Sequence, residues 1–166
     1  NIYNYSKFNI KNLLYKIFAY IMNYLGRRRI IYDRVNNEPY LERYYLFLKD
    51  RKKFPFNIFL HRFLKSDPDD LHDHPWDFRT IILCGVYWEY TDNGKFWRGA
   101  LSYRYCPAYT FHRLELDKNM PYCWTLFIPS KNSKEWGFRT NMGWLNHMDY
   151  LKKKRKEYYL IKNKTN

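Results

Sequence analysis

Residues 40–140 form a succession of short runs of aromatic and aliphatic residues, and each run ends in a turn signal. The strongest signal is Asn93-Gly94, a pair that favours a two-residue β-hairpin. We therefore expect residues 96–105 to fold back antiparallel on the run 77–90. Gly85 inside that run predicts a bulge or a sharp bend. The pattern predicts an all-β fold, either a small antiparallel barrel or a sandwich.

Further runs of the same kind predict strands over residues 40–48, 56–64, 109–116, 123–128 and 135–140. The chain of 166 residues is long enough for one well-packed domain with an extension, but it is short for two domains. Aromatic residues make up 22% of the chain, so the interior must be built largely from rings. These observations predict a single β core.

The N-terminal segment has a different pattern, because its apolar residues recur at helical spacing. We predict an amphipathic helix over residues 10–25, whose apolar face packs on the domain or on a second copy, or lies on a membrane surface. Lys and Asn residues interrupt the segment, so it is not predicted to span a membrane. We divide the chain into a helix with a basic connector (1–29), a β-barrel (30–145) and a basic C-terminal tail (146–166). The apolar face of the helix consists of Leu13, Leu14, Ile17, Phe18, Ile21 and Leu25.

The chain is strongly basic, with 30 Lys and Arg against 16 Asp and Glu, a net charge of +14. Such an excess favours an anionic partner, but much of it lies in the terminal segments, at 27–29 and 152–156. No recognised nucleic-acid-reading motif accompanies it, so nucleic acid or membrane binding is assigned to the termini only. Three widely spaced cysteines without a CxxC pair predict reduced thiols and a cytoplasmic protein.

The residues that point to chemistry are His72 and His74, two of the five histidines. On a β-strand, residues two apart share a face, so both imidazoles would lie on the same side and could chelate a metal. The best third ligand is His112, which follows after two predicted hairpin turns. Three histidines would leave open positions for water or substrate, as in catalytic metal sites. The alternative is a loop whose histidines only cap turns.

These residues resemble the two motifs of the cupin superfamily. His72, His74 and Gly85 are similar to its first motif, and Pro107 with His112 is similar to its second. The resemblance extends over about residues 30–145 to small uncharacterised cupin-like proteins of bacteria and bacteriophages. It implies a jelly-roll β-barrel that holds a divalent metal. The further matching segments are Tyr40-Leu41-Glu42-Arg43-Tyr44, His61-Arg62-Phe63, Ser66-Asp67, Leu71 to Trp76, His112 to Leu116, Trp124-Thr125-Leu126 and Glu135 to Phe138.

One departure from the cupin pattern concerns the metal ligands. The usual glutamate would fall near Phe78 or Arg79, and neither side chain binds metal. A site of three histidines resembles the thiol dioxygenase branch of cupins, which uses iron. If Asp77 or Glu89 joins as a fourth ligand, the site resembles the commoner cupins with three histidines and one carboxylate. The resemblance therefore implies Fe(II) as the preferred metal, with Zn, Mn and Ni as alternatives.

Three functions follow as hypotheses. The first is an enzyme, dioxygenase-like or isomerase-like, that acts on a small molecule at the histidine-bound metal. The second is a non-catalytic protein of viral origin that binds or sequesters a nucleotide-like ligand, in the cytoplasm of the host. The third is an interaction protein that uses the helix and the tail on membrane or nucleic acid. The cupin resemblance also implies a homodimer.

Six residues are candidates for binding the substrate. The arginines among them could hold a carboxylate or phosphate in the barrel mouth, or pair with acids on the surface. The histidine could support the metal ligands or be a packed core residue, and the tryptophans could line a pocket or belong to the core. These candidates are His61, Arg62, Arg79, Arg113, Trp76 and Trp124.

Overall fold

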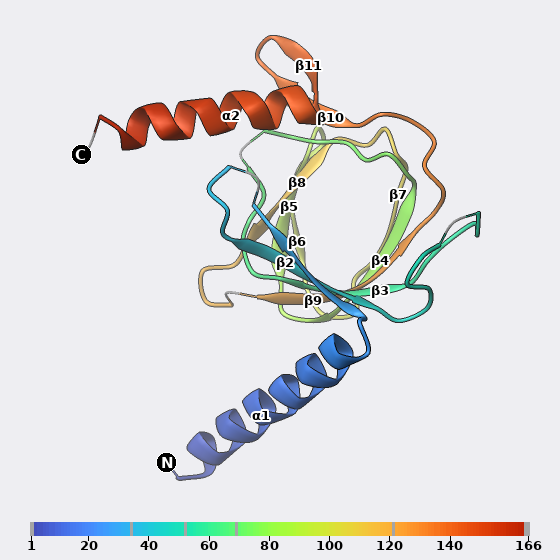
Figure 1. The fold of residues 1–166 in the computed structure, drawn as a ribbon, viewed down its shortest axis with the longest axis vertical. Coiled ribbons are helices and arrows are strands. Elements are labelled where there is room, and N and C mark those ends of the chain that lie inside the picture. Colours follow the sequence, from blue (N-terminus) through green and yellow to red (C-terminus); the bar gives the residue numbers. More distant parts are fainter. Residues whose placement is uncertain (1, 34, 52, 69, 121, 165–166) are drawn as a thin grey trace.

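The computed structural model of the protein describes residues 2–33, 35–51, 53–68, 70–120 and 122–164. Within them, antiparallel strands surround one interior, and a helix lies at each end of the chain (Figure 1). The elements are α1 (Ile2–Tyr24), β1 (Arg28–Tyr32), β2 (Pro39–Tyr45), β3 (Phe59–Phe63), β4 (Phe78–Cys84), β5 (Tyr87–Thr91), β6 (Gly94–Arg98), β7 (Tyr103–Cys106), β8 (His112–Leu116), β9 (Cys123–Pro129), β10 (Gly137–Thr140), β11 (Gly143–Asn146) and α2 (His147–Lys162).

The strands form a six-stranded sheet in the order β1-β2-β3-β9-β4-β7, a three-stranded sheet β6-β5-β8 and the pair β10-β11. The predicted hairpin at Asn93-Gly94 is confirmed, because β5 and β6 pair antiparallel with Thr91 opposite Gly94. The first two predicted strands of the core also pair, with Tyr44 opposite Leu60. The all-β, jelly-roll-like fold is therefore confirmed.

Alternation along the strands decides which side chains reach the interior. In β9 the buried residues Thr125 and Phe127 alternate with half-buried Trp124 and Leu126, because successive side chains of a strand point to opposite faces. The inner positions of several strands form the apolar core. Its main cluster consists of Phe59, Phe78, Cys106 and Phe127.

Two long runs of the sequence each form two strands instead of one. The run 77–90 divides into β4 and β5 because Gly85 has a φ of +89°, which an L side chain rarely adopts. The run 96–105 divides into β6, which pairs with β5, and β7, which pairs with β4. The strands β1 and β11 were not expected. Because β1 starts at Arg28, the barrel begins inside the segment assigned to the connector.

Both terminal segments of the described chain are helical. The predicted N-terminal helix is confirmed as α1, but of its predicted apolar face only Phe18 packs against the barrel. The segment expected as a basic tail forms α2, whose first turn is capped by the Asn146 side chain accepting a hydrogen bond from the Met148 amide. Residues 1, 165 and 166 of these segments lie outside the described residues. Neither helix, as described, has the length and apolarity needed to cross a membrane.

Candidate metal centre

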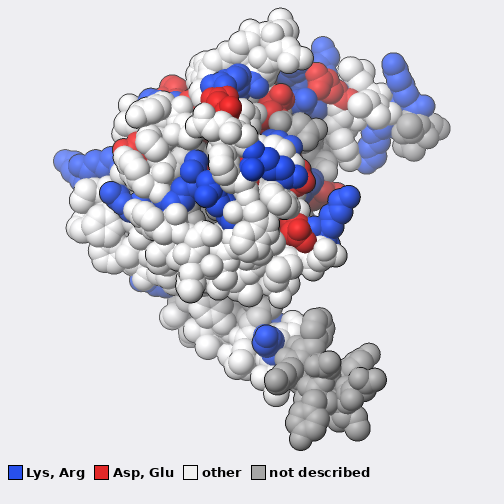
Figure 2. Space-filling model, turned by 180° about the vertical axis from the view of Figure 1, so that it is seen from behind, with Lys and Arg blue, Asp and Glu red and all other residues white. Residues whose placement is uncertain are grey.

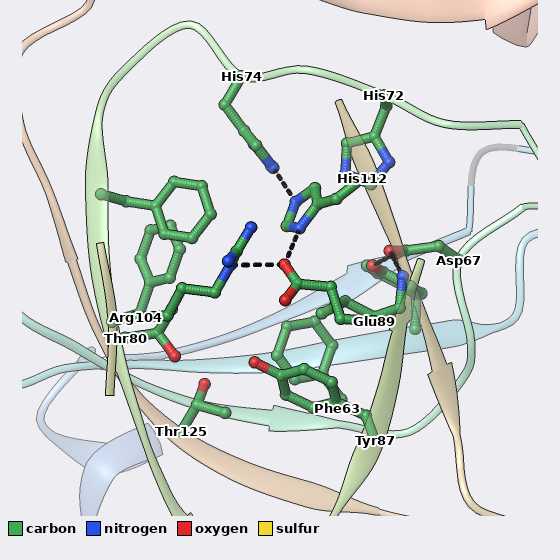
Figure 3. Close-up of a pocket in the computed structure, with 14 residues that line it drawn as sticks. Phe63, Asp67, His72, His74, Thr80, Tyr87, Glu89, Arg104, His112 and Thr125 are labelled. Atoms are coloured by element: carbon green, nitrogen blue, oxygen red, sulfur yellow. Dashed lines mark hydrogen bonds and ion pairs between the residues drawn. The ribbon is translucent and has the colours of Figure 1, made fainter. Parts of the chain in front are cut away.

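The structure brings the three predicted histidines together. His72 and His74 lie in the segment between β3 and β4, and His112 begins β8. One ring nitrogen of each lies within 4.8 Å of those of the other two, and the Nε2 atoms of His74 and His112 are 2.8 Å apart (Figure 3). His72 and His112 are buried, and His74 is half-buried. The three imidazoles therefore converge on one point inside the barrel.

The sequence analysis expected the histidine pair to lie on a strand, but the pair lies between strands and is held by its neighbours. His72 forms an isolated bridge with His112, in which each amide donates to the carbonyl of the other at 2.9 Å. The carboxylate of Asp73 accepts a hydrogen bond from the Gly137 amide at 2.7 Å, at the start of β10. The segment is thus fastened between β8 and β10. This fastening directs the side chains of both His72 and His74 to the interior (Figure 3).

The environment keeps the imidazoles of His72 and His74 neutral. Burial, together with the nearby His112, lowers the pKa of His72 to about 4, against an opposing effect of Asp67. Burial and the charges of the other two histidines also hold the pKa of His74 well below its ordinary value. Neutral imidazoles have a lone pair free to bind a metal.

The donor set fits a divalent metal. Three imidazoles suit Fe, Zn and Ni. His72 Nδ1 is buried and has no hydrogen-bond partner within the described part of the chain. Buried polar atoms are normally satisfied, and this unsatisfied one belongs to one of the three clustered histidines. The three residues are therefore able to hold such an ion.

Glu89 lies directly behind His112, on β5. Its Oε1 atom is 2.9 Å from His112 Nδ1 and 2.7 Å from Arg104 Nε, and its Oε2 atom accepts a hydrogen bond from Arg98 Nε at 2.9 Å. Burial raises the pKa of Glu89, but the hydrogen bond and charge of His112 and the charge of Arg104 outweigh it and leave the pKa below its usual value. The ionised carboxylate accepts a hydrogen bond from the Nδ1–H group of His112, which leaves His112 Nε2 facing the other two histidines.

The two carboxylates considered as a fourth ligand are thus engaged elsewhere. Glu89 contacts the far nitrogen of His112. Asp77 accepts hydrogen bonds from the Ala108 amide at 2.8 Å and from the Tyr105 hydroxyl at 3.1 Å. Within the described residues, the group of converging ligand atoms consists of the three histidines alone.

A cavity of about 60 Å³ lies in front of the histidines. Its opposite end carries the hydroxyl groups of Thr80, Tyr87 and Thr125, with Arg104 between them and the histidines (Figure 3). Thr125 Oγ1 is buried and has no partner among the residues that the structure describes. One water molecule needs roughly 10–15 Å³ on this scale, so the cavity accepts only a small molecule or the end of a larger one.

The sequence analysis did not select these four polar residues. Strand parity is a signal that could have found two of them. In β4, Thr80 lies two residues after Phe78 and therefore on the same inner face. In β9, Thr125 likewise lies between the inward positions 123 and 127. Arg104 carried no comparable signal, because β7 was expected to be part of another strand.

Four of the six substrate-binding candidates lie on the outer side of the barrel. Arg62 and Trp124 are under α1, with the guanidinium 5.7 Å from the centre of the indole ring. Arg79 lies over the ring of Tyr105, and Arg113 over that of Tyr90. Each of these four residues is next in sequence to an inward-facing residue of its strand. Because successive side chains of a strand point to opposite faces, each of the four points outward.

The other two candidates lie close to the site without lining the cavity. His61 is buried and stacks on Phe127 with ring centres 4.7 Å apart, and its Nε2 accepts a hydrogen bond from Arg43 Nε at 3.0 Å. Burial and then the charge of Arg43 hold the pKa of His61 well below its ordinary value. Trp76 is half-buried, with its ring centre 6.5 Å from that of His74. His61 is therefore placed as a packed, neutral core residue.

Comparisons with known proteins support this fold. No protein-family model and no curated protein sequence matches the chain. Among solved structures, a cupin-2 domain protein from Rhodospirillum rubrum superposes with a TM-score of 0.55 at 11% identity, over 70% of this chain and 78% of that one. A cupin 2 conserved barrel domain protein from Rhodopseudomonas palustris superposes with a TM-score of 0.55 at 12% identity, over 70% of this chain and 80% of that one. The chain therefore has the cupin fold.

A third similar structure is that of HppE with Fe(II), which superposes with a TM-score of 0.50 at 12% identity. The match covers 63% of this chain and 57% of HppE, so the chain spans little more than half the length of that protein. At such identities the similarity shows the fold alone. The homodimer, the relation to phage proteins and the cytoplasmic location stay predictions.

Proposed function

We propose that the protein is a metal-dependent enzyme that acts on a small molecule, with His72, His74 and His112 as the ligands of one divalent metal. The observation that carries the proposal is the convergence of three ring nitrogens within 4.8 Å of one another, at one end of a cavity. Three protein ligands leave coordination positions open, which is the arrangement of catalytic metal sites.

Fe(II) is the preferred metal, with Zn, Mn and Ni as alternatives. An iron ion with open positions supplies Lewis-acid and redox chemistry, which suits a dioxygenase-like or an isomerase-like reaction. HppE, which has the same fold, is known with Fe(II). Support for this metal therefore comes from the donor set and from the fold, and the identity of the ion is part of the proposal.

The surrounding residues provide orientation and charge. Glu89 accepts a hydrogen bond from the Nδ1–H group of His112, which keeps His112 Nε2 directed at the other two histidines. The walls of the cavity include the apolar side chains of Phe63 and Leu114. The hydroxyl of Thr125 is without a partner and is free to donate to a substrate oxygen at the end opposite the histidines.

The size of the cavity favours the enzyme over the nucleotide-binding hypothesis. A space of about 60 Å³ holds a few water molecules and not a nucleotide. Sites for drug-sized ligands measure about 300–1,000 Å³. We therefore propose a compact substrate that places one polar group at the metal and another near the three hydroxyl groups.

The test is the metal content and metal affinity of untagged protein. We expect about one equivalent of Fe(II) to bind under anaerobic conditions, since the site has one set of three ligands. The variants His72→Ala, His74→Ala and His112→Ala should each lose most of this binding. His147→Ala is the matched control, because His147 stacks on Trp136 outside the cavity. A triple alanine variant that binds Fe(II) as well as the wild type would refute the site.

A second measurement tests whether the site is open. Nitric oxide binds high-spin Fe(II) that has a free coordination position and gives a characteristic electron paramagnetic resonance signal. We expect this signal from the iron-loaded protein, because three histidines leave positions unfilled. An iron-loaded protein that gives no such signal would have a closed, structural site, and the enzymatic proposal would then be wrong.

A further inference from the structure

Helix α1 has two apolar faces, and only one of them is covered. The inner face packs on Tyr44, Leu60 and Trp124 of the six-stranded sheet. It consists of Tyr15, Phe18, Ala19 and Met22. The outer face occupies about 140° of the helix circumference at 100° per residue, and its side chains are 47–82% exposed. It consists of Ile10, Leu13, Leu14, Ile17, Tyr20, Ile21, Tyr24 and Leu25.

The helix is fastened so that the outer face stays turned away from the barrel. The Tyr15 hydroxyl donates to the buried carboxylate of Glu42 at 2.8 Å. After the last turn, the Arg27 guanidinium donates to the carbonyl of Tyr45 at 2.9 Å. From this attachment α1 leads away from the barrel, with its N-terminal end farthest out (Figure 1). The eight outer side chains therefore form a continuous exposed stripe, larger than scattered surface apolar residues require.

The charge around this stripe has one sign. Residues 1–32 contain six Lys and Arg and no Asp or Glu. In Figure 2 the described part of the helix is white and blue, without red. A cationic segment beside an apolar stripe is the pattern of helices that lie in the interface of an anionic bilayer. Tyr20 and Tyr24 fit this setting, since tyrosine prefers the depth of the lipid headgroups.

A second exposed apolar group lies next to the end of α1. The rings of Phe47, Phe54 and Phe56 form a cluster with centres 5.2–5.6 Å apart, in the segment between β2 and β3. The carbonyl of Phe47 accepts a hydrogen bond from Arg27 at 3.2 Å, which joins this cluster to the last turn of the helix. Each of the three rings is more than a third exposed.

We propose that the outer face of α1 docks the protein on a membrane surface that contains anionic lipid, with the helix axis in the plane of the bilayer. A second copy of the chain fits less well, because it would bring another segment with six cations and no acid of its own against the first, and of these cations Arg28 is already paired with Glu42 of the barrel. An anionic surface neutralises these charges while the bilayer covers the apolar stripe. The proposal does not depend on the metal centre.

The experiment measures binding of the full chain to vesicles by flotation. The vesicles are phosphatidylcholine alone, or phosphatidylcholine with phosphatidylserine. We expect partitioning onto the anionic vesicles to be at least about tenfold stronger, and to weaken with salt, because each basic residue near the surface contributes. Wild-type protein that floats with neither type of vesicle would overturn the proposal.

The variants separate the apolar stripe from the charge. Leu14→Glu, Ile17→Glu and Ile21→Glu, combined, place acids on the outer face and should reduce partitioning by about tenfold or more. The combination Leu14→Ser, Ile17→Ser and Ile21→Ser should also reduce it, without adding charge. Met142→Glu, Met148→Glu and Leu160→Glu make the same charge change at exposed positions outside α1 and serve as the control.

Equal losses in the outer-face and control variants would overturn the role of the stripe. Light scattering tests the rival occupant: a dimer that the outer-face variant abolishes, without any vesicle binding, would assign the stripe to a second copy. Circular dichroism and urea unfolding check that each variant is folded.

Discussion

At the scale of single residues, Glu89 connects the metal centre to the barrel wall. It is 1% exposed and contacts His112 on one side and Arg98 and Arg104 on the other. A buried carboxylate is costly unless it is paired, and here both oxygens are engaged. The sequence marked Glu89 as an alternative ligand, whereas the structure places it behind a ligand. Its role is to position His112.

Replacing this carboxylate should weaken metal binding without removing it. We expect Glu89→Gln to lower Fe(II) affinity by about 10–100-fold, the usual effect of removing a hydrogen-bond partner of a metal-bound histidine. Affinity is measured by competition with a chelator. Glu115→Gln, on the same strand as His112 but half-buried beside Arg113, is the control. Affinities within twofold for Glu89→Gln and the wild type would show that Glu89 has no such role.

A second buried carboxylate, that of Glu42, joins α1 to the sheet. It accepts hydrogen bonds from Tyr44 at 2.5 Å and from Tyr15 at 2.8 Å, and pairs with Arg28 and Arg62. Burial raises the pKa of Glu42, but the hydrogen bonds from the tyrosines and the charges of the arginines outweigh it and leave the pKa below its ordinary value.

Because the pKa of Glu42 is lowered in the folded protein, the free energy of unfolding should fall as the pH falls. A carboxyl whose pKa is lower in the folded state stabilises the fold at a pH above the unfolded value, about 4.3, and loses that contribution as the pH falls through the folded value. We expect Glu42→Gln to lower the free energy of unfolding by about 3 kcal/mol at pH 7. The difference should shrink between pH 5 and pH 3.

Urea unfolding at pH 7, 5, 4 and 3 measures this difference. Glu135→Gln, at an exposed position, makes the same charge change and should leave stability nearly unchanged. If the wild type and Glu42→Gln keep the same difference in stability from pH 7 to pH 3, titration of Glu42 does not contribute.

At the scale of elements, Gly85 separates β4 from β5 and allows the second strand to leave the six-stranded sheet. Its φ is +89°, and an added Cβ would lie 2.6 Å from the carbonyl oxygen of Tyr122 and 2.9 Å from the Cα of Cys123. The bend carries Glu89 to the three-stranded sheet, where β5 pairs with β8 and Glu89 meets His112. The metal centre therefore depends on this glycine.

Gly85→Ala should destabilise the protein by about 3 kcal/mol, because backbone strain adds to a contact with backbone atoms that cannot move aside freely. Gly94→Ala is the matched control: Gly94 also has a positive φ, +123°, but has no neighbouring atom within 4 Å. We expect Gly94→Ala to lower the free energy of unfolding by about 1–2 kcal/mol, from backbone strain alone. Chemical denaturation compares the two variants, and equal losses would show that the close approach to β9 is unimportant.

At the scale of the whole molecule, metal binding should stabilise the entire barrel, because the three ligands come from two segments that are far apart in the chain, His72 with His74 in one and His112 in the other. An ion that binds only the folded state at a hundred times its Kd adds about 2.7 kcal/mol. For a chain of this size we expect the melting temperature to rise by about 5–10 °C. Calorimetry with and without Fe(II), under anaerobic conditions, measures the shift. His112→Ala should show none, and a shift of wild-type size in that variant would place the stabilising ion elsewhere.

Patterns in the sequence are sufficient for the fold class, the hairpin at Asn93-Gly94, the bend at Gly85 and the grouping of three histidines. The first three depend on turn chemistry and on the two-residue period of strands, which act between neighbouring residues. His112, far along the chain, was grouped with the pair by motif spacing. The same period would also have directed Arg113 outward once His112 faced the interior. The helical spacing of apolar residues did not reveal that α1 packs on the sheet through Tyr15, Phe18, Ala19 and Met22 and leaves its more apolar face exposed.

Other features of the site depend on contacts between residues distant in sequence. The sheet order β3-β9-β4 brings Thr125 beside Thr80, and the pairing of β5 with β8 puts Glu89 against His112. Neither arrangement has a local signal, because strand order is decided by how the apolar faces of all strands are buried together. The histidines are recognisable from the chain alone, whereas the small cavity in front of them and the carboxylate behind them exist only in the closed barrel.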